Sequence, residues 1–334
     1  MSGARLRIGI VGAGHFGRYH ALKVVASERA ELAGVHDPDE ERARAVGWEA
    51  GAPAMSFEAL LDAADAVIIA APSEAHHALA SAALNAGKHV LVEKPIASTL
   101  AQADELAAIA AARGLVLQVG HLERFSGAYG ALAGRMSSPL YIEATRIAPY
   151  KQRGTDVSVI LDLMIHDLDL ILALVDSPIE AVDAVGAAVA SQHEDIANAR
   201  IRFASGAVAT ITASRISSRT ERRMRLFAKD GYMAVDFANR SLIVVAQGRG
   251  KPVPAVEGFG FEEISWQEHD SLAAEHAAFA ASVLDGAPVM VDAAAGRRAL
   301  AAALSVTDAM AAARQKAIAS GLIEQFQDSG GGRL

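Results

Sequence analysis

The stretch IGIVGAGHFGRYH, residues 8–20, sets three glycines between a short apolar run and a segment with helical spacing. An apolar strand followed by a G-x-G-x-x-G turn and a helix is the arrangement that cradles the pyrophosphate of a dinucleotide. In that arrangement Gly12 makes the sharp turn, Gly14 lets the backbone approach an anion, and Gly17 lets the helix pack close to the strand. The phosphates would lie on amide N–H groups at the positive end of the helix. The stretch therefore predicts a dinucleotide-binding turn.

An aspartate follows at the distance that this interpretation requires. Asp37 lies twenty residues after Gly17, at the end of the second apolar strand, where its carboxylate would accept hydrogen bonds from ribose hydroxyls. A carboxylate there also repels a 2′-phosphate, and the acidic segment HDPDEE has only His36 beside its acids, so we expect NAD rather than NADP. Two other interpretations remain open: a structural turn with a solvated acidic loop, and the glycine turn and acid of a methyltransferase.

Composition narrows the classes of protein. A chain of 334 residues exceeds what one hydrophobic core usually serves, so two domains are expected. We predict neither a membrane span nor a signal peptide, because no run of about 18 uncharged apolar residues occurs and the N-terminus leads straight into a strand pattern. The absence of cysteine excludes disulfides and thiolate chemistry and fits the cytoplasm. The net charge of −8 argues against nucleic acid as the main partner.

Apolar strands alternate with helical segments from Arg5 to about Gly120, which predicts a parallel sheet with helices on both faces. We therefore expect an α/β fold with a doubly wound NAD-binding domain over residues 1–122. Residues 123–334 are expected to form a substrate-binding and oligomerisation domain with a large, open, mostly antiparallel sheet and C-terminal helices. The expected strands of this sheet are LYIEATRIA and the segments 180–190, 196–203, 207–214, 222–229, 231–237 and 240–247. The expected helices span 156–175, 270–285 and 292–318.

Polar groups gather where the parallel strands end, which is where open α/β sheets bind their ligands. Three features are expected there: Pro72-Ser73 with His76, Glu93-Lys94-Pro95, and His121 with Arg124. Lys94 directly follows a buried strand and Pro95 fixes the turn, so we expect the ammonium group to point at the cofactor. The alternative is an ordinary salt bridge at the edge of the sheet.

The segment DVSVILDLMIHDLDLILALV, residues 156–175, is apolar around most of a helix but carries Asp162, His166 and Asp169 on one stripe. Buried carboxylates and imidazoles are costly unless they are paired or wet, so this stripe is expected to face a cavity or an internal network. Because Asp162 lies one turn before His166, it can orient and charge the imidazole. An acid–base pair is favoured over a histidine satisfied within the core.

Positive charges concentrate just before this segment, at Arg124, Arg146, Lys151 and Arg153. Arginine pairs bind diphosphate oxygens well through forked hydrogen bonds. We therefore expect an anionic substrate group near them, with ordinary surface charges as the alternative.

No metal is predicted to be required. His193, Glu194 and Asp195 lie in an expected hairpin loop, and a solvated turn is favoured there over a metal site. No other donors have metal-site spacing nearby.

These motifs together resemble the Gfo/Idh/MocA oxidoreductase family over nearly the whole chain. The resemblance rests on GAGHFG, PSEAH, GKHVLVEKP, GHLERF, the D-x-x-x-H pair of Asp162 and His166, and FASGAVATITASR. It implies an N-terminal Rossmann domain, a C-terminal α/β domain with an open sheet, and a nicotinamide at their interface. It also implies that Lys94 is the catalytic lysine with Asp162 and His166 as its partners, and that the Lys94–Pro95 bond is cis. The open sheet would join subunits into a homodimer or homotetramer.

Within the family, the wording GTDVSVILDLMIHDLDLI with QVGHLERF and RIAPYKQRG is similar to dehydrogenases that oxidise C3 of nucleotide-linked sugars, UDP-N-acetylglucosamine in particular. Many family members carry GGG before the aspartate, where this chain has VSVIL. The likeness implies hydride transfer from C3 of a UDP-sugar to NAD, with His166 as the base and Lys94 stabilising the oxygen. Two alternatives remain open: a family dehydrogenase acting on a cyclitol or free sugar, and a non-catalytic NAD-binding sensor.

Motif and resemblance together give a set of candidate site residues. The positions assigned to NAD are Gly12, Ala13, Gly14, His15, Phe16, Gly17, Asp37, Ala71, Pro72, Ser73, His76, Glu93 and Lys94. The positions assigned to the substrate are His121, Arg124, Arg146 and Arg153.

Overall fold

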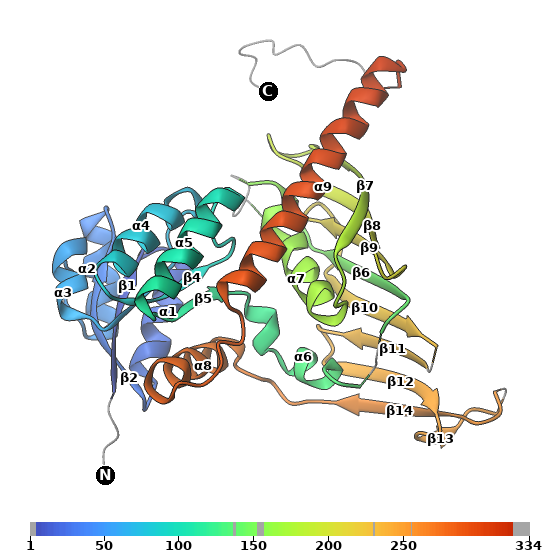
Figure 1. The fold of residues 1–334 in the computed structure, drawn as a ribbon, viewed down its shortest axis with the longest axis horizontal. Coiled ribbons are helices and arrows are strands. Elements are labelled where there is room, and N and C mark those ends of the chain that lie inside the picture. Colours follow the sequence, from blue (N-terminus) through green and yellow to red (C-terminus); the bar gives the residue numbers. More distant parts are fainter. Residues whose placement is uncertain (1–4, 136–137, 152–156, 230, 255, 323–334) are drawn as a thin grey trace.

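Two β-sheets organise the chain (Figure 1). The computed structural model describes residues 5–135, 138–151, 157–229, 231–254 and 256–322. A five-stranded sheet lies in the N-terminal part of the chain, and a nine-stranded sheet lies in the C-terminal part. Within the described ranges, no helix has the length and apolar character needed to cross a membrane.

The N-terminal sheet is parallel, with the strand order β2-β1-β3-β4-β5. Its strands are β1 (Leu6–Val11), β2 (Ala30–His36), β3 (Ala66–Ile69), β4 (His89–Glu93) and β5 (Leu117–Gly120). Its helices are α1 (His15–Val25), α2 (Glu40–Ala50), α3 (Phe57–Ala63), α4 (Ser73–Asn85) and α5 (Leu100–Arg113). Every residue of β3 and β5 is buried, as expected when both faces of a parallel sheet are covered. The predicted doubly wound fold is confirmed.

Most helices of this domain begin with a side-chain cap. Asp39 accepts a hydrogen bond from the Arg42 amide at the start of α2, and Thr99 forms a capping box with Gln102 at the start of α5. Helix α1 differs, because it begins at Gly14, which has no side chain to cap it. Its first amide groups are therefore available to a ligand.

The C-terminal sheet has the strand order β13-β14-β12-β11-β10-β6-β9-β8-β7. Its strands are β6 (Tyr141–Ile147), β7 (Ile179–Ala187), β8 (Ile196–Phe203), β9 (Val208–Ser214), β10 (Glu221–Ala228), β11 (Gly231–Asp236), β12 (Ser241–Gln247), β13 (Lys251–Pro252) and β14 (Phe259–Ser265). Strand β6 pairs in parallel with β9 and antiparallel with β10, so it lies inside the sheet. The mostly antiparallel sheet is confirmed.

Strands β13 and β14 were not predicted. They follow a segment rich in glycine and proline, and β14 carries two consecutive glutamates, so the local pattern does not favour a strand. Seven residue pairs formed with β12 hold β14 in the sheet instead. The expected count of strands was therefore too low.

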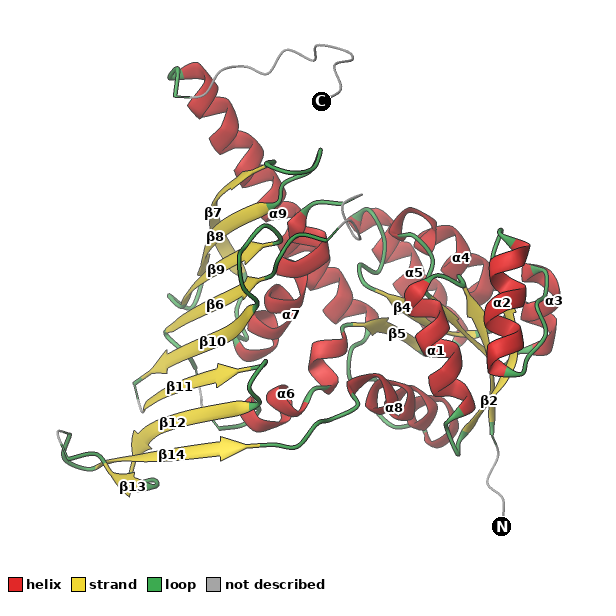
Figure 2. Ribbon diagram, turned by 180° about the vertical axis from the view of Figure 1, so that it is seen from behind, coloured by secondary structure: helices red, strands yellow, loops and turns green. Residues whose placement is uncertain are grey.

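Helices cover one face of this second sheet, namely α6 (Gly127–Leu132), α7 (Ile165–Leu174) and α9 (Ala293–Ala319) (Figures 1 and 2). Side chains of β6 alternate between buried and half-buried because successive residues point to opposite faces. Ile142 and Ala144 face the helices and belong to the same core as Ile165 and Ile171 of α7. Among the described residues, no helix lies on the other face.

The chain returns to the N-terminal domain near its end. Helix α8 (Ser271–Asp285) places Phe279, which is fully buried, in the core that contains Ile8 and Ile10 of β1. At the start of α9, Gly296 lies against Val119 of β5. The predicted division after residue 122 therefore separates the two sheets, whereas the packing of the C-terminal helices crosses it.

The segment expected as one α-helix over 156–175 has two parts. Ile160–Met164 form a π-helix, and α7 begins at Ile165. Residues 152–156, where the helix was expected to begin, lie outside the described residues. A π-turn has i→i+5 hydrogen bonds in place of i→i+4, and hydrophobic spacing does not distinguish the two over five residues. The expectation of a regular α-helix was wrong for this turn.

Candidate active site

The glycine turn has the geometry that its spacing predicts. Gly12 has a φ of +97°, and a Cβ there would lie 2.7 Å from the carbonyl of Ala70. A Cβ on Gly17 would lie 1.7 Å from the Gly12 carbonyl oxygen, so the helix can approach the strand only without a side chain. A Cβ on Gly14 would meet nothing within 4 Å. The turn is therefore tight on its inner side and open beside Gly14, which fits an anion bound on the amides of α1.

Asp37 lies at the end of β2, beside this turn. Its carboxylate accepts hydrogen bonds from the amides of Ala13 at 2.7 Å and Asp39 at 2.9 Å, and the residue is buried. Arg42 Nη1 lies 3.7 Å from Asp37 Oδ2, a basic neighbour that the sequence analysis did not count. The amide hydrogen bonds fix the carboxylate next to the cradle, where the ribose of a dinucleotide would lie.

The other positions assigned to NAD surround this turn or lie between β3 and the end of β4. They are Ala13, His15, Phe16, Ala71, Pro72, Ser73, His76, Glu93 and Lys94. His76 joins two of these segments, since Nδ1 lies 2.8 Å from the Pro95 carbonyl oxygen and Nε2 lies 2.9 Å from that of Ala71. The ends of β3 and β4 are thereby held together.

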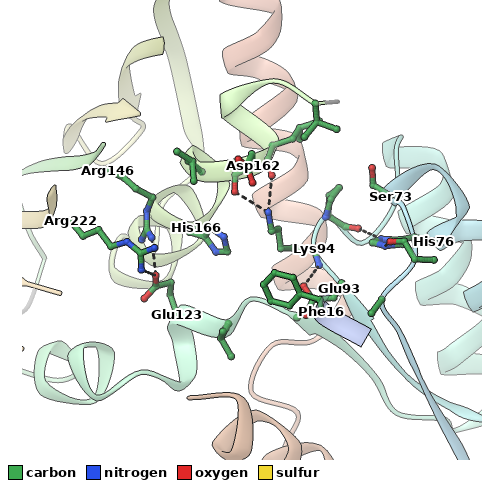
Figure 3. Close-up of a pocket in the computed structure, with 18 residues that line it drawn as sticks. Phe16, Ser73, His76, Glu93, Lys94, Glu123, Arg146, Asp162, His166 and Arg222 are labelled. Carbon is green, nitrogen blue, oxygen red and sulfur yellow. Dashed lines mark hydrogen bonds and ion pairs between the residues drawn. The ribbon is translucent and has the colours of Figure 1, made fainter. Parts of the chain in front are cut away.

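A cavity of about 440 Å³ lies where the two domains meet (Figure 3). The N-terminal domain contributes Phe16, Ser73, His76, Glu93 and Lys94 to its lining. The C-terminal part contributes Glu123, Arg146, Leu161, Asp162, His166 and Arg222. Lys94 and His166 are 72 positions apart in the sequence, yet both line this one cavity.

Lys94 reaches across the boundary between the domains. Its Nζ donates hydrogen bonds to the carbonyl oxygens of Leu161 at 3.1 Å and Asp162 at 2.9 Å. Both carbonyls belong to the π-turn, and such turns are frequent at functional sites. The Lys94–Pro95 peptide bond is cis, as the resemblance implied. The ammonium group is therefore held at the edge of the cavity by backbone oxygens.

His166 presents a neutral imidazole to the cavity. Burial, followed by the positive charges of Lys94 and Arg146, holds the pKa of His166 well below its usual value. Its Nδ1 is buried and has no hydrogen-bond partner in the part of the chain that the structure describes. Asp162, which was expected to orient the imidazole, therefore forms no hydrogen bond with this nitrogen. The π-turn alters the regular i, i+4 relation on which that expectation rested.

A buried polar network lies behind Glu93. His20 Nε2 lies 3.0 Å from Glu93 Oε1, and His20 Nδ1 lies 2.8 Å from His276 Nε2. Glu275 on α8 is fully buried, and neither of its carboxylate oxygens has a partner among the described residues. Burial, and then the charge of Glu93, raises the pKa of Glu275 well above its usual value and so favours the protonated carboxyl group. The sequence analysis assigned no role to Glu275.

The arginines expected to bind an anion are largely paired. Arg146 is buried and donates hydrogen bonds to Asp167 at 2.8 and 3.1 Å and to Glu123 at 2.9 Å. Although burial opposes its charge, these two carboxylates raise the pKa of Arg146, and it stays cationic. Asp167, which the sequence analysis did not single out, is thus the counter-ion of a predicted substrate residue.

Two other substrate candidates do not line the cavity. Arg124 donates a hydrogen bond to Asp169 at 3.0 Å and another to the Tyr129 hydroxyl at 2.7 Å, and it borders a separate cavity beside α9. Asp169 therefore points away from the stripe expected with Asp162 and His166. His121 is buried, with neither ring nitrogen hydrogen-bonded to a described residue. Arg153 lies outside the described residues.

Arg222, at the start of β10, lines the cavity and was missed. A signal for it exists in the sequence ERRMRLF, because Arg222 shares a strand face with Met224 and Leu226, which point into the core. The segment was expected as a strand, and because alternate residues of a strand share a face, the pattern indicates that Arg222 lies on the inner face.

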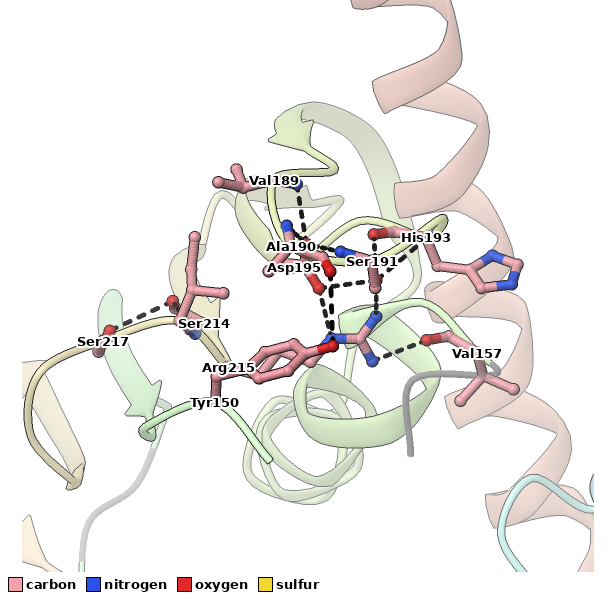
Figure 4. Close-up of polar contacts among 11 residues, drawn as sticks. Tyr150, Val157, Val189, Ala190, Ser191, His193, Asp195, Ser214, Arg215 and Ser217 are labelled. Atoms are coloured by element: carbon pink, nitrogen blue, oxygen red, sulfur yellow. Dashed lines mark hydrogen bonds and ion pairs between the residues drawn. The ribbon is translucent and has the colours of Figure 1, made fainter. Parts of the chain in front are cut away.

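The loop between β7 and β8 contacts the segment that leads into the π-turn (Figure 4). Arg215 donates one hydrogen bond to Asp195 at 2.8 Å and another to the Val157 carbonyl at 2.8 Å. The Val159 amide donates to the Glu194 carbonyl at 2.9 Å. Asp195 is fully buried, so the expectation of a solvated turn was wrong for this residue. In the described ranges, no group of three or more potential ligands could hold a metal ion.

An open glycine cradle at the start of α1, next to a cavity that holds a lysine and a neutral histidine, defines an NAD-binding oxidoreductase. Residues 6–121 match the oxidoreductase family Gfo/Idh/MocA with its NAD-binding Rossmann fold, and residues 131–234 match the Gfo/Idh/MocA C-terminal domain. The chain belongs to the Gfo/Idh/MocA oxidoreductase family, and the predicted family and cofactor class are confirmed.

Known relatives show where the chain lies within the family. UDP-N-acetylglucosamine 3-dehydrogenase from Acidithiobacillus ferrooxidans is 43% identical over 314 residues, which cover 93% of this chain and 99% of that protein. A solved structure of that enzyme has a TM-score of 0.87 and covers 92% of this chain and 98% of its own. The scyllo-inositol 2-dehydrogenase (NAD(+)) of Bacillus subtilis is 28% identical over 310 residues, or 86% of this chain and 89% of that protein.

Proposed function

We propose that this chain is an NAD-dependent dehydrogenase that oxidises the C3 hydroxyl of UDP-N-acetylglucosamine, or of a close relative, to a 3-keto sugar. The observation that carries the proposal is that Lys94 and His166 line one cavity beside the glycine cradle. The 43% identity to UDP-N-acetylglucosamine 3-dehydrogenase supports the choice of substrate. Asp37, whose carboxylate would repel a 2′-phosphate, supports NAD over NADP.

Gly12, Gly14 and Asp37 would hold the dinucleotide, and NAD would supply a hydride acceptor when bound. His166 takes the proton of the C3 hydroxyl, because its neutral ring has a free lone pair at neutral pH. Lys94 donates a hydrogen bond to the same oxygen and stabilises negative charge that develops there. The substrate thus loses a proton to His166 and a hydride from C3, which balances a two-electron oxidation of the alcohol to a ketone.

Asp162 contributes through its backbone in this proposal. Its carbonyl oxygen, with that of Leu161, holds Lys94 Nζ at the edge of the cavity. A lysine fixed in this way loses little additional freedom when it meets the substrate oxygen. We therefore assign Asp162 to positioning Lys94, in addition to the family role that the resemblance implied for its carboxylate.

The test is nicotinamide absorbance with NAD and a panel of UDP-N-acetylglucosamine, free N-acetylglucosamine and myo-inositol. The proposal expects reduction of NAD with the nucleotide sugar and at least tenfold lower kcat/KM with the other two. Turnover of myo-inositol or the free sugar without turnover of the nucleotide sugar would exclude this substrate class.

A cyclitol or free-sugar dehydrogenase is the second candidate, and one observation favours it. The counter-ions of Arg124 and Arg146 remove much of the positive charge expected for a diphosphate. The likeness to scyllo-inositol 2-dehydrogenase, at 28% identity, points the same way. The substrate panel separates the two candidates, and a chain that binds NAD but turns over no alcohol would be the sensor.

We also propose that the sheet face without helices joins two or four copies of the chain. Tyr141, Phe227 and Tyr232 lie on this face, with ring centroids 5.7 and 4.9 Å apart along the row. These three side chains are half-buried, and a row of aromatic side chains that are partly open to solvent is typical of a protein interface. Sedimentation should give a homodimer or homotetramer, and a monomer at micromolar concentration would contradict this. The cytoplasmic location remains a prediction of the sequence.

A further inference from the structure

Arg222 is placed to contact a ligand by its position in the second sheet. It lies at the start of β10, directly opposite Arg146 on β6, and both side chains share the strand face that turns toward the cavity. Like charges on directly opposed residues are unfavourable unless a counter-ion compensates them. Figure 3 shows Arg222 on the far side of His166 from Lys94.

The two arginines differ in how far their N–H groups are engaged. Arg146 donates hydrogen bonds through Nε and both Nη atoms, to Asp167 and Glu123. For Arg222, the only carboxylate within 4 Å among the described residues is that of Glu123, and its distance of 3.8 Å is too long for a hydrogen bond. Glu123 is already bound to Arg146. Arg222 is therefore a cavity cation whose guanidinium donors remain available.

The surroundings of Arg222 favour an anion. Its side chain is 49% exposed, so a ligand can reach it. Partial burial, followed by the positive charge of Arg146, lowers the pKa of Arg222. A second hollow of about 150 Å³, lined in part by Thr220 and Asn239, adjoins it, and Arg222 lines both spaces. The guanidinium thus lies where the catalytic cavity continues outward.

We propose that Arg222 binds the diphosphate of a nucleotide-linked sugar and selects such substrates over free sugars and cyclitols. The inference rests on the proposed function and adds the group that recognises the anion. In a pyranose, C3 and the anomeric carbon are separated by one ring atom. A sugar whose C3 hydroxyl meets Lys94 and His166 therefore holds its phosphates a few bonds away. A guanidinium fork binds two phosphate oxygens at once, which the ammonium group of a lysine cannot do.

The experiment compares Arg222→Gln with Arg225→Gln. Arg225 is the matched control, because it lies on the same strand with the same 49% exposure but faces the opposite side of the sheet and pairs with Glu143. That side is the face proposed to join subunits, so sedimentation first checks that both variants keep the wild-type assembly. Binding of UDP to the NAD-loaded protein is measured by calorimetry, and KM and kcat are measured with UDP-N-acetylglucosamine. We expect Arg222→Gln to weaken UDP binding and raise KM by about 10–100-fold, as the loss of charge-assisted hydrogen bonds does. Arg225→Gln should stay within twofold of wild type.

The outcomes separate this inference from the proposed function. If wild type turns over the nucleotide sugar but Arg222→Gln leaves both UDP affinity and KM within twofold, the inference is wrong while the proposed function stands. Equal losses in Arg222→Gln and Arg225→Gln would also overturn it. If wild type turns over no nucleotide sugar, the proposed function fails first. Arg222→Lys, which keeps the charge but not the fork, should recover only part of the affinity, and it provides a second folded variant should Arg222→Gln unfold.

Discussion

The two walls of the cavity are built by different means. The cofactor wall, made by the glycine turn, Asp37 and the end of β4 up to Lys94, is shaped mainly by backbone that approaches closely and leaves amides open. The charged wall carries Glu123, Arg146, His166 and Arg222, and it is shaped mainly by the ion pairs of Arg146 with Glu123 and with Asp167 behind it. The difference teaches that the first wall is built by contacts that are local in the chain, whereas the second is built by charge pairs between residues far apart in the sequence.

Lys94 joins the two walls, and its removal should have the largest effect. Lys94→Ala removes the group proposed to stabilise the substrate oxygen, and we expect kcat to fall by about 10²–10⁴-fold. His166→Ala should lower kcat by a similar factor. NAD affinity, followed by fluorescence titration, should change much less in His166→Ala, because this residue lies on the charged wall. A kcat within tenfold of wild type for both variants would show that Lys94 and His166 do not have the proposed catalytic roles.

Arg146→Met tests how much the buried ion pair of Arg146 and Asp167 in the charged wall stabilises the protein. It leaves Asp167 buried without its partner, and breaking a buried ion pair in this way costs about 3–5 kcal/mol of the free energy of unfolding. The double variant Arg146→Met/Asp167→Leu should recover most of that loss, since no unpaired charge remains. Urea denaturation measures both. An Arg146→Met variant as stable as wild type would mean that the pair contributes nothing to the wall.

Gly17→Ala and Gly14→Ala test the cofactor wall, because the same methyl group meets opposite surroundings. At Gly17 it would collide with the Gly12 carbonyl, and we expect a loss of about 3 kcal/mol in the stability of the ligand-free protein. At Gly14 it meets open space, so stability should stay within about 0.5 kcal/mol. The space is where the anion is expected, so Gly14→Ala should weaken NAD by roughly tenfold. Equal thermal shifts for the two variants would contradict this difference.

The smallest effect is expected behind the cofactor wall, at Glu275. Its folded-state pKa is raised, whereas an unfolded glutamate titrates near 4.3, so between these values the folded protein binds one more proton. Stability therefore falls as pH rises, by about 1.4 kcal/mol per pH unit at most, and Glu275→Gln removes this slope. Wild type and Glu275→Gln are compared from pH 5 to 9, because the contributions of His166 and His276, whose pKa values are lowered, are common to both proteins and cancel in the difference. Parallel stability curves for wild type and variant would show that Glu275 is ionised.

Much of the cofactor wall could be predicted from the sequence, because its determinants are close together in the chain. Gly12 and Gly17 leave no room for a side chain, and Gly14 borders open space beside the start of α1. The doubly wound sheet follows from the alternation of apolar strands and helices in the same way. Lys94 lines the cavity at the end of β4, and its position directly after a buried strand is the local feature from which the sequence predicts this.

The charged wall could be predicted only in part, because its contacts are not local. The sequence shows that Arg146 is basic, but not that Asp167 on α7 neutralises it. The same holds for Arg124 with Asp169. The π-turn at Ile160–Met164 depends on packing against the rest of the fold rather than on hydrophobic spacing, so the relation of Asp162 to His166 was misjudged.

The packing of α8 against the N-terminal domain affects the order in which the chain can fold during synthesis. Phe279 fills part of the core beneath β1, so this core is not complete until residues 271–285 have left the ribosome. Domains often fold in the order of synthesis. Here a core that begins with the first strand is completed by a helix that is synthesised much later, so the N-terminal domain reaches its full packing only after that helix has emerged.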